Sequence, residues 1–340
     1  MTGRMIAALL LSAGVSLAVG PWLIRRLKKL HFGTVIYELG PAHQQKQGTP
    51  VMGGLMIALG MALCQALLHP YPGQGLWDMG LGLAAVSLLS MAVGFADDWI
   101  KAVKKRHEGL TPWQKIAGQV IVAAAFTCWC YFHPQIGSKI VVPFLGKEWD
   151  LGIWYLPVMG LLVIFYVNST NLQDGLDGLL GTITVVTSEA WTVVILLGIY
   201  LLGMSREVYT PAAIFAIGLV GGCVGYLRFN RYPARVFMGD TGSMLLGGAT
   251  VGLAMVTRMP LLLILIGICP IASSVSVILQ RYYFKGTRRF SSDHQGRRLF
   301  LMSPVHHHFE KKGYTETQIV SMYAGVSTVT GLIAILSLLK

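Results

Sequence analysis

Long apolar stretches are the feature of this sequence that most constrains its fold. A transmembrane helix needs about 20 apolar residues to cross the hydrocarbon core of a bilayer. Only 12% of the 340 residues are charged, about half the share of roughly 25% in soluble domains. The sequence therefore predicts an all-α polytopic membrane protein, with residues 1–340 as a single domain. The ten predicted spans are residues 5–24, 51–69, 77–96, 116–133, 151–167, 179–203, 210–227, 241–257, 260–280 and 319–338.

The positive charges indicate how these spans are oriented. Most of the 27 Lys and Arg residues fall in the connections after the first, third, seventh and ninth spans. Connections rich in Lys and Arg stay on the cytoplasmic side of a membrane. The rule predicts both termini outside and a basic cytoplasmic surface, suited to membrane lipids and anionic substrates. Because the charge is spread over loops at the membrane edge, a nucleic acid is not an expected partner.

Three segments outside the central spans have predicted features of their own. The N-terminus resembles a signal peptide, but its apolar run reaches "RRLKKL" without a clear cleavage site, so we expect a retained helix. Residues 137–152, on the outer side, alternate weakly around Gly146 and predict a small β-hairpin. Residues 281–318 form the longest internal connection, which we expect to hold amphipathic helices.

Three groups of acids lie at the predicted cytoplasmic edge of the spans. The segment "NLQDGLDG" contains Asp174 and Asp177, which would share a face on a helix. Asp97 and Asp98 end the third span, and Asp240 opens the eighth. Asp is an ordinary turn residue and a common helix cap. However, acids this close to lipid are costly and usually functional, so the three groups together predict a site.

The composition of these groups favours a hard cation. The five cysteines have no metal-ligand spacing, and carboxylates without cysteines favour Mg²⁺ over Zn²⁺. Mg²⁺ typically takes one or two carboxylates, keeps waters and shares substrate phosphates. The five aspartates therefore cannot all be ligands, and some would act as a base or bind a polar substrate.

Two further segments could meet phosphates at the same edge. The segment "SPVHHHFEKKG" offers His306, His307 and His308 as donors, although it is also compatible with a solvated turn. The segment "KQGTPVMGG" offers Lys46 and several glycines, although Pro50 equally suits a plain helix start. No P-loop motif is present. The residues predict a membrane-edge site that joins a soluble phosphorylated compound to a lipid phosphate.

Five segments, taken in order, resemble the signature blocks of the polyprenyl-phosphate N-acetylhexosamine-1-phosphate transferases: "GTPVMGG", "GFADDWIK", "NSTNLQDGLDGL", "FNRYPARVFMGDTGS" and "SPVHHHFEKKG". The triple-His block is similar to that of the phospho-N-acetylmuramoyl-pentapeptide transferase branch. This resemblance implies transfer of phospho-MurNAc-pentapeptide from UDP-MurNAc-pentapeptide to undecaprenyl phosphate. The implied products are lipid I and UMP. Mg²⁺ is the implied cofactor, and the implied location is the bacterial plasma membrane, with the active site facing the cytoplasm.

The resemblance also implies a role for each matching residue. Asp240 would be the Mg²⁺ ligand, and Asp97 the base that deprotonates the lipid phosphate, with Asp98 beside it. Phe237 would stack on uracil, helped by Asn230. The expected catalytic residues are Asp97, Asp98, Asp240, His306 and His307. The expected substrate-binding residues are Lys46, Lys101, Lys115, Asn171, Asp174, Asp177, Asn230, Phe237 and His308.

Several alternatives stay open at this point. The same chemistry with UDP-GlcNAc as the donor is the nearest. A cation-coupled transporter would need functional acids near the bilayer midplane, where only Glu189 is expected. A purely structural scaffold would not need five aspartates at one edge. Direct displacement and a covalent aspartyl-phosphate route both fit the residues, as do a monomer and a homodimer.

Overall fold

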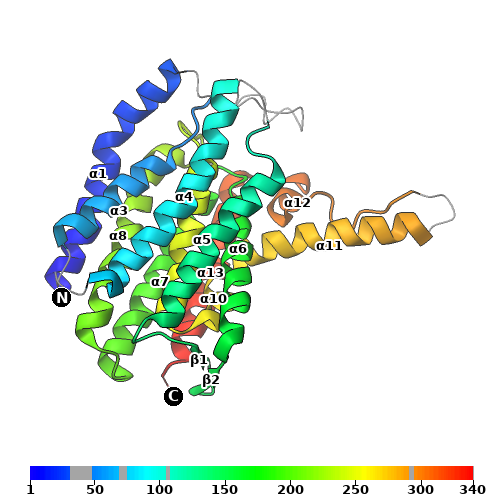
Figure 1. The fold of residues 1–340 in the computed structure, drawn as a ribbon. Coiled ribbons are helices and arrows are strands. Elements are labelled where there is room, and N and C mark those ends of the chain that lie inside the picture. Colours follow the sequence, from blue (N-terminus) through cyan, green and yellow to red (C-terminus); the bar gives the residue numbers. More distant parts are fainter. Residues whose placement is uncertain (31–47, 69–74, 105–107, 291–294, 340) are drawn as a thin grey trace.

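Helices make up most of the described part of the chain, which also holds one small sheet (Figure 1). The computed structural model describes residues 1–30, 48–68, 75–104, 108–290 and 295–339. The helices are α1 (Thr2–Lys29), α3 (Gly54–Leu68), α4 (Met79–Lys104), α5 (Pro112–Phe132), α6 (Tyr155–Gln173), α7 (Leu179–Leu201), α8 (Arg206–Asn230), α9 (Gly239–Val256), α10 (Leu263–Ile266), α11 (Ile268–Phe290), α12 (Val305–Lys311) and α13 (Glu316–Leu336). The strands are β1 (Lys139–Val142) and β2 (Lys147–Asp150), and the short 3-10 helices are η1 (Gly75–Trp77), η2 (Gly152–Trp154) and η3 (Pro260–Leu262).

Among the described residues, seven helices are long and apolar enough to cross a membrane, namely α1, α4, α5, α6, α7, α8 and α13. A bent pair, Pro260–Ile266 and Ile268–Arg289, would raise the number to 8 if it forms one span. The chain is therefore a multi-pass membrane protein, as its composition predicts. The count of ten spans and the outside placement of both termini stay predictions.

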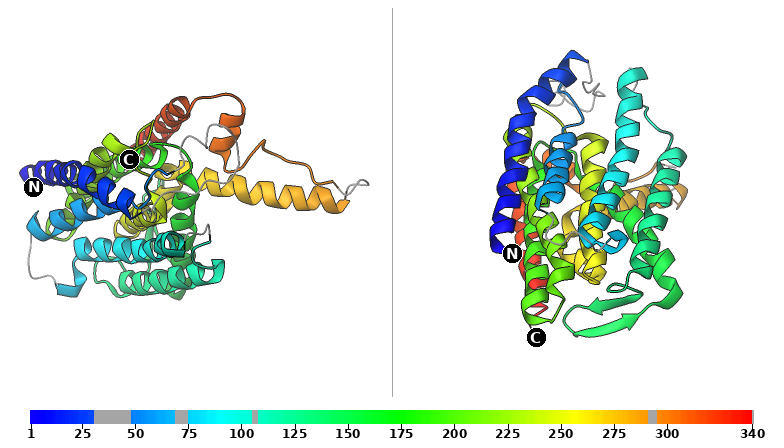
Figure 2. Two further views of the ribbon diagram at one scale, coloured as in Figure 1. Left: turned by 90° about the horizontal axis from the view of Figure 1, so that it is seen from above. Right: turned by 60° about the vertical axis from the view of Figure 1, so that its left-hand side comes forward.

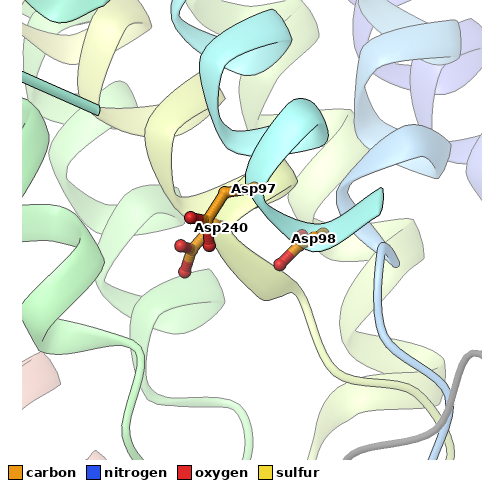
Figure 3. Close-up of side chains that lie close together, drawn as sticks. All are labelled: Asp97, Asp98 and Asp240. Carbon is orange, nitrogen blue, oxygen red and sulfur yellow. The ribbon is translucent and has the colours of Figure 1, made fainter. Parts of the chain in front are cut away.

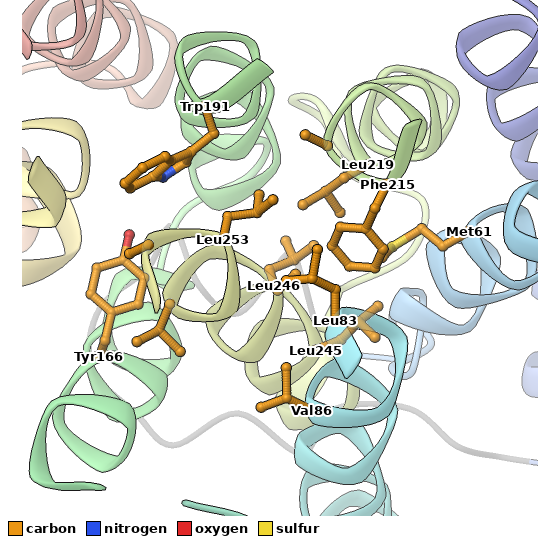
Figure 4. Close-up of a cluster of buried hydrophobic side chains, with 14 of the residues drawn as sticks. Met61, Leu83, Val86, Tyr166, Trp191, Phe215, Leu219, Leu245, Leu246 and Leu253 are labelled. Atoms are coloured by element: carbon orange, nitrogen blue, oxygen red, sulfur yellow. The ribbon is translucent and has the colours of Figure 1, made fainter. Parts of the chain in front are cut away.

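Helix α9 forms the centre of the bundle. All its residues from Thr241 to Val256 are buried, and its main neighbours are α4 and α6. Because α9 has no lipid-facing side, it can carry Gly and Thr where an outer helix would carry Leu. Figure 4 shows its leucines among apolar side chains of the surrounding helices: Leu245, Leu246 and Leu253 from α9, with Leu83, Val86, Tyr166, Trp191, Phe215 and Leu219.

The predicted span 260–280 is not one straight helix. The chain turns by 83° between Pro260–Ile266 and Ile268–Arg289. Pro270 has no N–H to bond the Ile266 carbonyl, which weakens a continuous helix at this point. Beyond the bend, α11 projects away from the bundle (Figures 1 and 2). It exposes Tyr282 and Tyr283 beside basic residues, a pattern typical of a helix at a membrane surface.

The predicted hairpin is present. Strands β1 and β2 pair antiparallel with Lys139 opposite Asp150, and Gly146 takes the left-handed conformation at the turn (φ 61°). Arg258, which follows α9, fixes the hairpin because its carbonyl accepts the Val141 N–H at 2.7 Å and its guanidinium bonds Glu148 at 2.6 Å. The hairpin and the C-terminus lie at the end of the bundle opposite to the end of α4 (Figure 1).

Two glycines allow α9 to approach its neighbours. A Cβ on Gly94 of α4 would lie 2.1 Å from the Asp240 carbonyl oxygen, and a Cβ on Gly54 of α3 would lie 2.1 Å from Gly242 Cα. Both contacts are with backbone, which cannot rotate away. They join α3, α4 and α9 at the end of the bundle where the acids of α4 and α9 lie.

Replacing Gly94 by Ala should therefore destabilise the protein. The added methyl group must push α4 from α9, and overpacking of this kind costs about 1–3 kcal/mol. We expect a lower midpoint of thermal unfolding for the purified protein in detergent. The matched control is Gly14→Ala on α1, where a Cβ meets nothing within 4 Å. That change should leave the midpoint unchanged or raise it, and an equal loss in both variants would contradict the close-approach argument.

Candidate active site

Three aspartates distant in sequence meet where α4 ends and α9 begins (Figure 3). One carboxylate oxygen from each of Asp97, Asp98 and Asp240 lies within 4.8 Å of the others. Asp97 and Asp98 are buried and Asp240 is partly buried. Like charges this close repel one another unless cations or N–H donors compensate them, so the partners of each carboxylate define the site.

Asp98 is bonded to the first turn of α9. Its Oδ2 accepts the Thr241 N–H at 2.9 Å and the Thr241 hydroxyl at 2.7 Å. The first N–H groups of a helix have no partner within the helix, so Asp98 caps α9 from a neighbouring helix. Gly239 (φ 73°) allows this contact, because a Cβ there would lie 2.5 Å from Asp98 Oδ2. Asp98 thus sets the position of α9 relative to α4.

Asp97 has a backbone donor and a cation as partners. Its Oδ1 accepts the Leu110 N–H at 2.9 Å, and its Oδ2 pairs with Lys101 Nζ at 2.5 Å. A carboxylate near the C-terminal end of a helix is disfavoured by the helix dipole, and Lys101 offsets this cost. The pairing leaves Asp97 facing Asp240 across the cluster (Figure 3).

Asp240 is the most heavily paired of the three. Its Oδ2 lies 2.7 Å from Lys115 Nζ and 3.3 Å from Lys101 Nζ, and its Oδ1 accepts the Asn171 amide at 2.7 Å. Asn171 also donates to the Ser243 hydroxyl at 2.9 Å. The structure therefore brings Lys101, Lys115 and Asn171, all expected to bind substrate, to the same carboxylate.

The donor set fits a divalent cation. The three carboxylates supply hard oxygen ligands from two helices, and Mg²⁺ uses one or two such ligands with water and phosphate oxygens. Lys101 and Lys115 lie within ion-pair distance of the same oxygen of Asp240. A cation held by Asp240 would leave both lysines able to pair with phosphate instead.

The acids of "NLQDGLDG" lie in a turn between α6 and α7. Asp174 follows the end of α6, and Gly178 is left-handed (φ 77°), so the helix face that would have paired the two acids does not exist. Asp177 turns away, since its carboxylate accepts the Ala234 N–H at 2.9 Å and its own N–H donates to Glu316 at 2.8 Å. The expectation that Asp174 and Asp177 share a helix face was wrong.

Asp174 faces the aspartate cluster instead. Burial, reinforced by the negative charges of Asp240, Asp98 and Asp177, raises the pKa of Asp174 to about 8, although the Gly239 N–H donates to it. Asp174 can therefore carry a proton near neutral pH in the free protein. A cation or a positively charged group brought to this place would favour its ionised form.

The three histidines of α12 have different surroundings. His306 is fully buried against the acidic turn, since a Cβ on Gly175 would lie 2.3 Å from His306 Nε2. His307 lies next to it, with Nδ1 2.8 Å from Glu310. His308 faces the other way, where its Nδ1 accepts the Leu301 N–H at 3.1 Å. Of the three, His306 and His307 are the ones that contact the acidic turn.

Two expected nucleotide contacts, Asn230 and Phe237, are partly used to hold the loops. Buried Asn230 accepts the Gly178 N–H at 3.1 Å and donates to the Val236 carbonyl at 2.9 Å. The Phe237 backbone bonds Pro50 and Gly53, each at 2.8 Å, while its ring is half-buried. This bonding joins "GTPVMGG" to "VFMGD". Lys46 lies outside the described residues.

The chain has relatives among known proteins. Residues 80–258 match the family described as glycosyl transferase family 4. The chain is similar to proteins named phospho-N-acetylmuramoyl-pentapeptide-transferase from Heliobacterium modesticaldum, Clostridium novyi and Solidesulfovibrio magneticus. The identities are 39%, 38% and 39%, over 98%, 99% and 99% of this chain and 97%, 97% and 93% of theirs. The chain belongs to this transferase family.

One contact of the acidic turn was missed in the sequence. Glu316, at the start of α13, accepts the Asp177 N–H. No spacing rule connects residues so far apart. The only local signal is that Thr315 begins a helix with a capping box formed with Gln318, which places an acid in the first turn but does not show what it contacts.

Acidification should destabilise this transferase through His306. Burial, and then the neighbouring His307, lowers the pKa of His306 to about 3, whereas an unfolded His titrates near about 6.5. As the pH falls below about 6.5, the His306 side chain gains a proton in the unfolded state but not in the folded state. The free energy of unfolding is therefore highest above about pH 6.5 and decreases as the pH falls toward about 3. The loss is at most about 1.4 kcal/mol per pH unit.

This prediction is tested by thermal unfolding at about pH 7.5 and about pH 5.5. The drop in unfolding midpoint should be smaller in His306→Gln than in the wild type. His308→Gln, at a half-buried position of the same helix, should keep the wild-type drop. Equal drops in all three proteins would show that His306 does not gain its proton on unfolding.

Proposed function

We propose that this protein transfers phospho-MurNAc-pentapeptide from UDP-MurNAc-pentapeptide to undecaprenyl phosphate. The products are lipid I and UMP, in peptidoglycan biosynthesis. The observation that carries the proposal is the cluster of Asp97, Asp98 and Asp240 with Lys101 and Lys115 at the ends of membrane helices. Relatives that match over almost their whole length carry the name of this transferase.

The charges of the cluster suit a reaction between a diphosphate and a phosphate monoester. An oxygen of the lipid phosphate bonds to the phosphorus attached to the sugar, and the bond from that phosphorus to UMP breaks. Both reactants are anionic, so cations must reduce their repulsion. Lys101 and Lys115 lie on one edge of the Asp240 carboxylate and are placed to pair with phosphate oxygens.

The three aspartates would have different tasks. Asp98 would hold α9 in position, because its two hydrogen bonds to described residues both go to Thr241. Asp240, with Asp97 nearby, would hold Mg²⁺, which when bound neutralises charge on the diphosphate. A phosphate monoester has its second pKa near about 6, so the acceptor carries little proton at neutral pH. Asp97 would take the proton that remains.

Around this centre, the remaining polar groups would bind the donor. Asp174 and Asn171 face the cluster from the end of α6, and His306 and His307 contact the turn that carries Asp174. The half-buried ring of Phe237 would stack on uracil. Asn230, Asp177 and His308 would act mainly by holding the loops in place.

We place the site at the cytoplasmic face of a bacterial plasma membrane, where a soluble nucleotide donor is available. The hairpin at the opposite end of the bundle (Figure 1) would then be external. Ten spans with both termini outside, and contact of the outer helices with membrane lipids, belong to the same proposal. A homodimer stays a prediction. Glu189 is exposed on α7 rather than part of a central ion pathway, which disfavours a transporter.

Release of UMP by the purified protein in detergent tests the reaction. With undecaprenyl phosphate and Mg²⁺ present, UDP-MurNAc-pentapeptide should release UMP and UDP-GlcNAc should not. EDTA should abolish release, because the carboxylate cluster needs a divalent cation. Release with UDP-GlcNAc alone would move the protein to the neighbouring branch. No release with either donor from folded protein would refute the proposal.

Asp174→Asn and Asp177→Asn separate a substrate contact from a structural one. Asn at 174 can still accept the Gly239 N–H, so we expect a normal unfolding temperature and at least about a hundredfold loss of UMP release. Loss of the Asp177 charge weakens its bond to the Ala234 N–H, at a cost of about 1–2 kcal/mol, so this variant should unfold at a lower temperature. Near-wild-type turnover in Asp174→Asn would remove Asp174 from the site.

A further inference from the structure

The outward faces of α4 and α5 carry exposed aromatic and aliphatic side chains right beside the charged cluster. On α4, Trp99 is 46% exposed and Val103 is 58% exposed. On α5, Trp113 is 81% exposed, and it is followed on the same side by Ile116 at 42%. Trp99 stacks on Phe95, one turn earlier, with ring centroids 5.7 Å apart. We call these exposed apolar residues of the two neighbouring helices the apolar flank.

On both helices, the apolar residues lie on the face opposite to the charged residues of the cluster. Successive side chains of an α-helix are about 100° apart, so residues two positions apart point in nearly opposite directions. Asp97 and Lys101 face the cluster, and Trp99 and Val103 lie on the opposite face. On α5, Lys115 faces Asp240, and Trp113 lies on the opposite face.

The apolar flank reaches beyond the level of the charges. Val103 lies about 9 Å past Asp97 along the axis of α4, and Trp113 lies about 3 Å past Lys115 toward the same end of the bundle, at the usual helical rise. At this end of the bundle, Val103 lies in the last turn of α4 and Trp113 in the first turn of α5, next to the exposed polar residues Lys104 and Gln114. Large apolar side chains mixed with polar ones are typical of the boundary between the hydrocarbon core and the headgroups.

Short contacts tie the flank rigidly to the cluster. The Leu110 N–H, just before α5, donates to Asp97 at 2.9 Å. A Cβ on Gly118 of α5 would lie 3.0 Å from Val93 of α4, so the two helices lie close together behind the cluster. Any surface that fixes Trp99 and Trp113 therefore also fixes the carboxylates and lysines.

We infer that Trp99, Val103 and Trp113 form an anchor that sits in the headgroup layer of the bilayer and holds the cluster at the depth of a lipid phosphate. Trp is favoured at this level because its ring is apolar and its N–H can bond a headgroup. Exposed Lys104, at the end of α4, suits the lipid phosphates. The three are positioning residues, and the inference rests on the proposed function because depth matters only for a lipid substrate.

Kinetics in mixed micelles test this role. The mole fraction of undecaprenyl phosphate in the micelles is varied in one series, and the concentration of UDP-MurNAc-pentapeptide is varied in another. For the double variant W99A/W113A we expect the KM for the lipid acceptor to rise by about fivefold or more. The KM for the soluble donor and kcat should stay within about twofold. W99Y/W113Y, which keeps amphipathic rings, should restore most of the acceptor KM.

Trp22→Ala is the matched control. Trp22 is 52% exposed and lies near a basic helix end on α1, with Arg26 over its ring at 5.8 Å. We expect no change in either KM for this variant. An unchanged acceptor KM in W99A/W113A, or an equal loss for both substrates, would overturn the anchor.

A second measurement does not depend on activity. Tryptophan fluorescence is recorded in vesicles whose phospholipids are brominated either close to the headgroups or near the chain ends. The emission of Trp99 and Trp113 is the difference between the spectra of the wild type and of W99F/W113F. This difference emission should be quenched most by the bromines close to the headgroups. Quenching by neither lipid would show that the two rings face water or a protein partner, and would overturn the inference. If no donor releases UMP, the proposed function fails while this result still decides the position of the flank.

Discussion

The bond between the Asp98 carboxylate and the first turn of α9 is the interaction on which the rest of the site depends. A buried carboxylate is costly unless hydrogen bonds replace its lost hydration, and the N–H groups at a helix start need an acceptor. Oδ2 of Asp98 serves both needs by accepting the N–H and the hydroxyl of Thr241. Since Asp97 precedes Asp98 and Asp240 precedes Thr241, the same bond brings Asp97 and Asp240 face to face. The lysines then reduce the repulsion that this pairing creates.

Much of the fold could be predicted because the bilayer imposes a length and a composition on every helix that crosses it. The hairpin could be predicted from alternation around Gly146, and the acids could be recognised because they are rare so close to lipid. The arrangement of helices could not be predicted in this way. Apolar periodicity shows which face of a helix avoids water, but not which neighbour covers it. The central position of α9 depends on contacts such as Gly54 against Gly242, which connect distant parts of the chain.

Two differences from the sequence predictions, one at the acidic turn and one before α11, have a local physical origin. Spacing of i and i+3 places Asp174 and Asp177 together only if a helix continues through both, and Gly178 in the left-handed conformation belongs to a turn instead. The bend before α11 depends on Pro270 within an otherwise apolar run, where hydropathy alone indicates a straight span. In both cases one residue that controls backbone conformation overrides a pattern of side chains.

The contacts of the loops change how their sequence motifs should be interpreted. Asp177 bonds Ala234 and Glu316, Asn230 bonds Gly178 and Val236, and His306 packs on Gly175. These groups connect four polar segments to one another at the end of the bundle, beside a small apolar cluster that includes Leu176, Ile319 and Phe309. A side chain can therefore be essential for turnover because it positions a neighbour that binds substrate. Loss of activity alone does not separate the two roles, whereas a change in stability or in the KM for one substrate does.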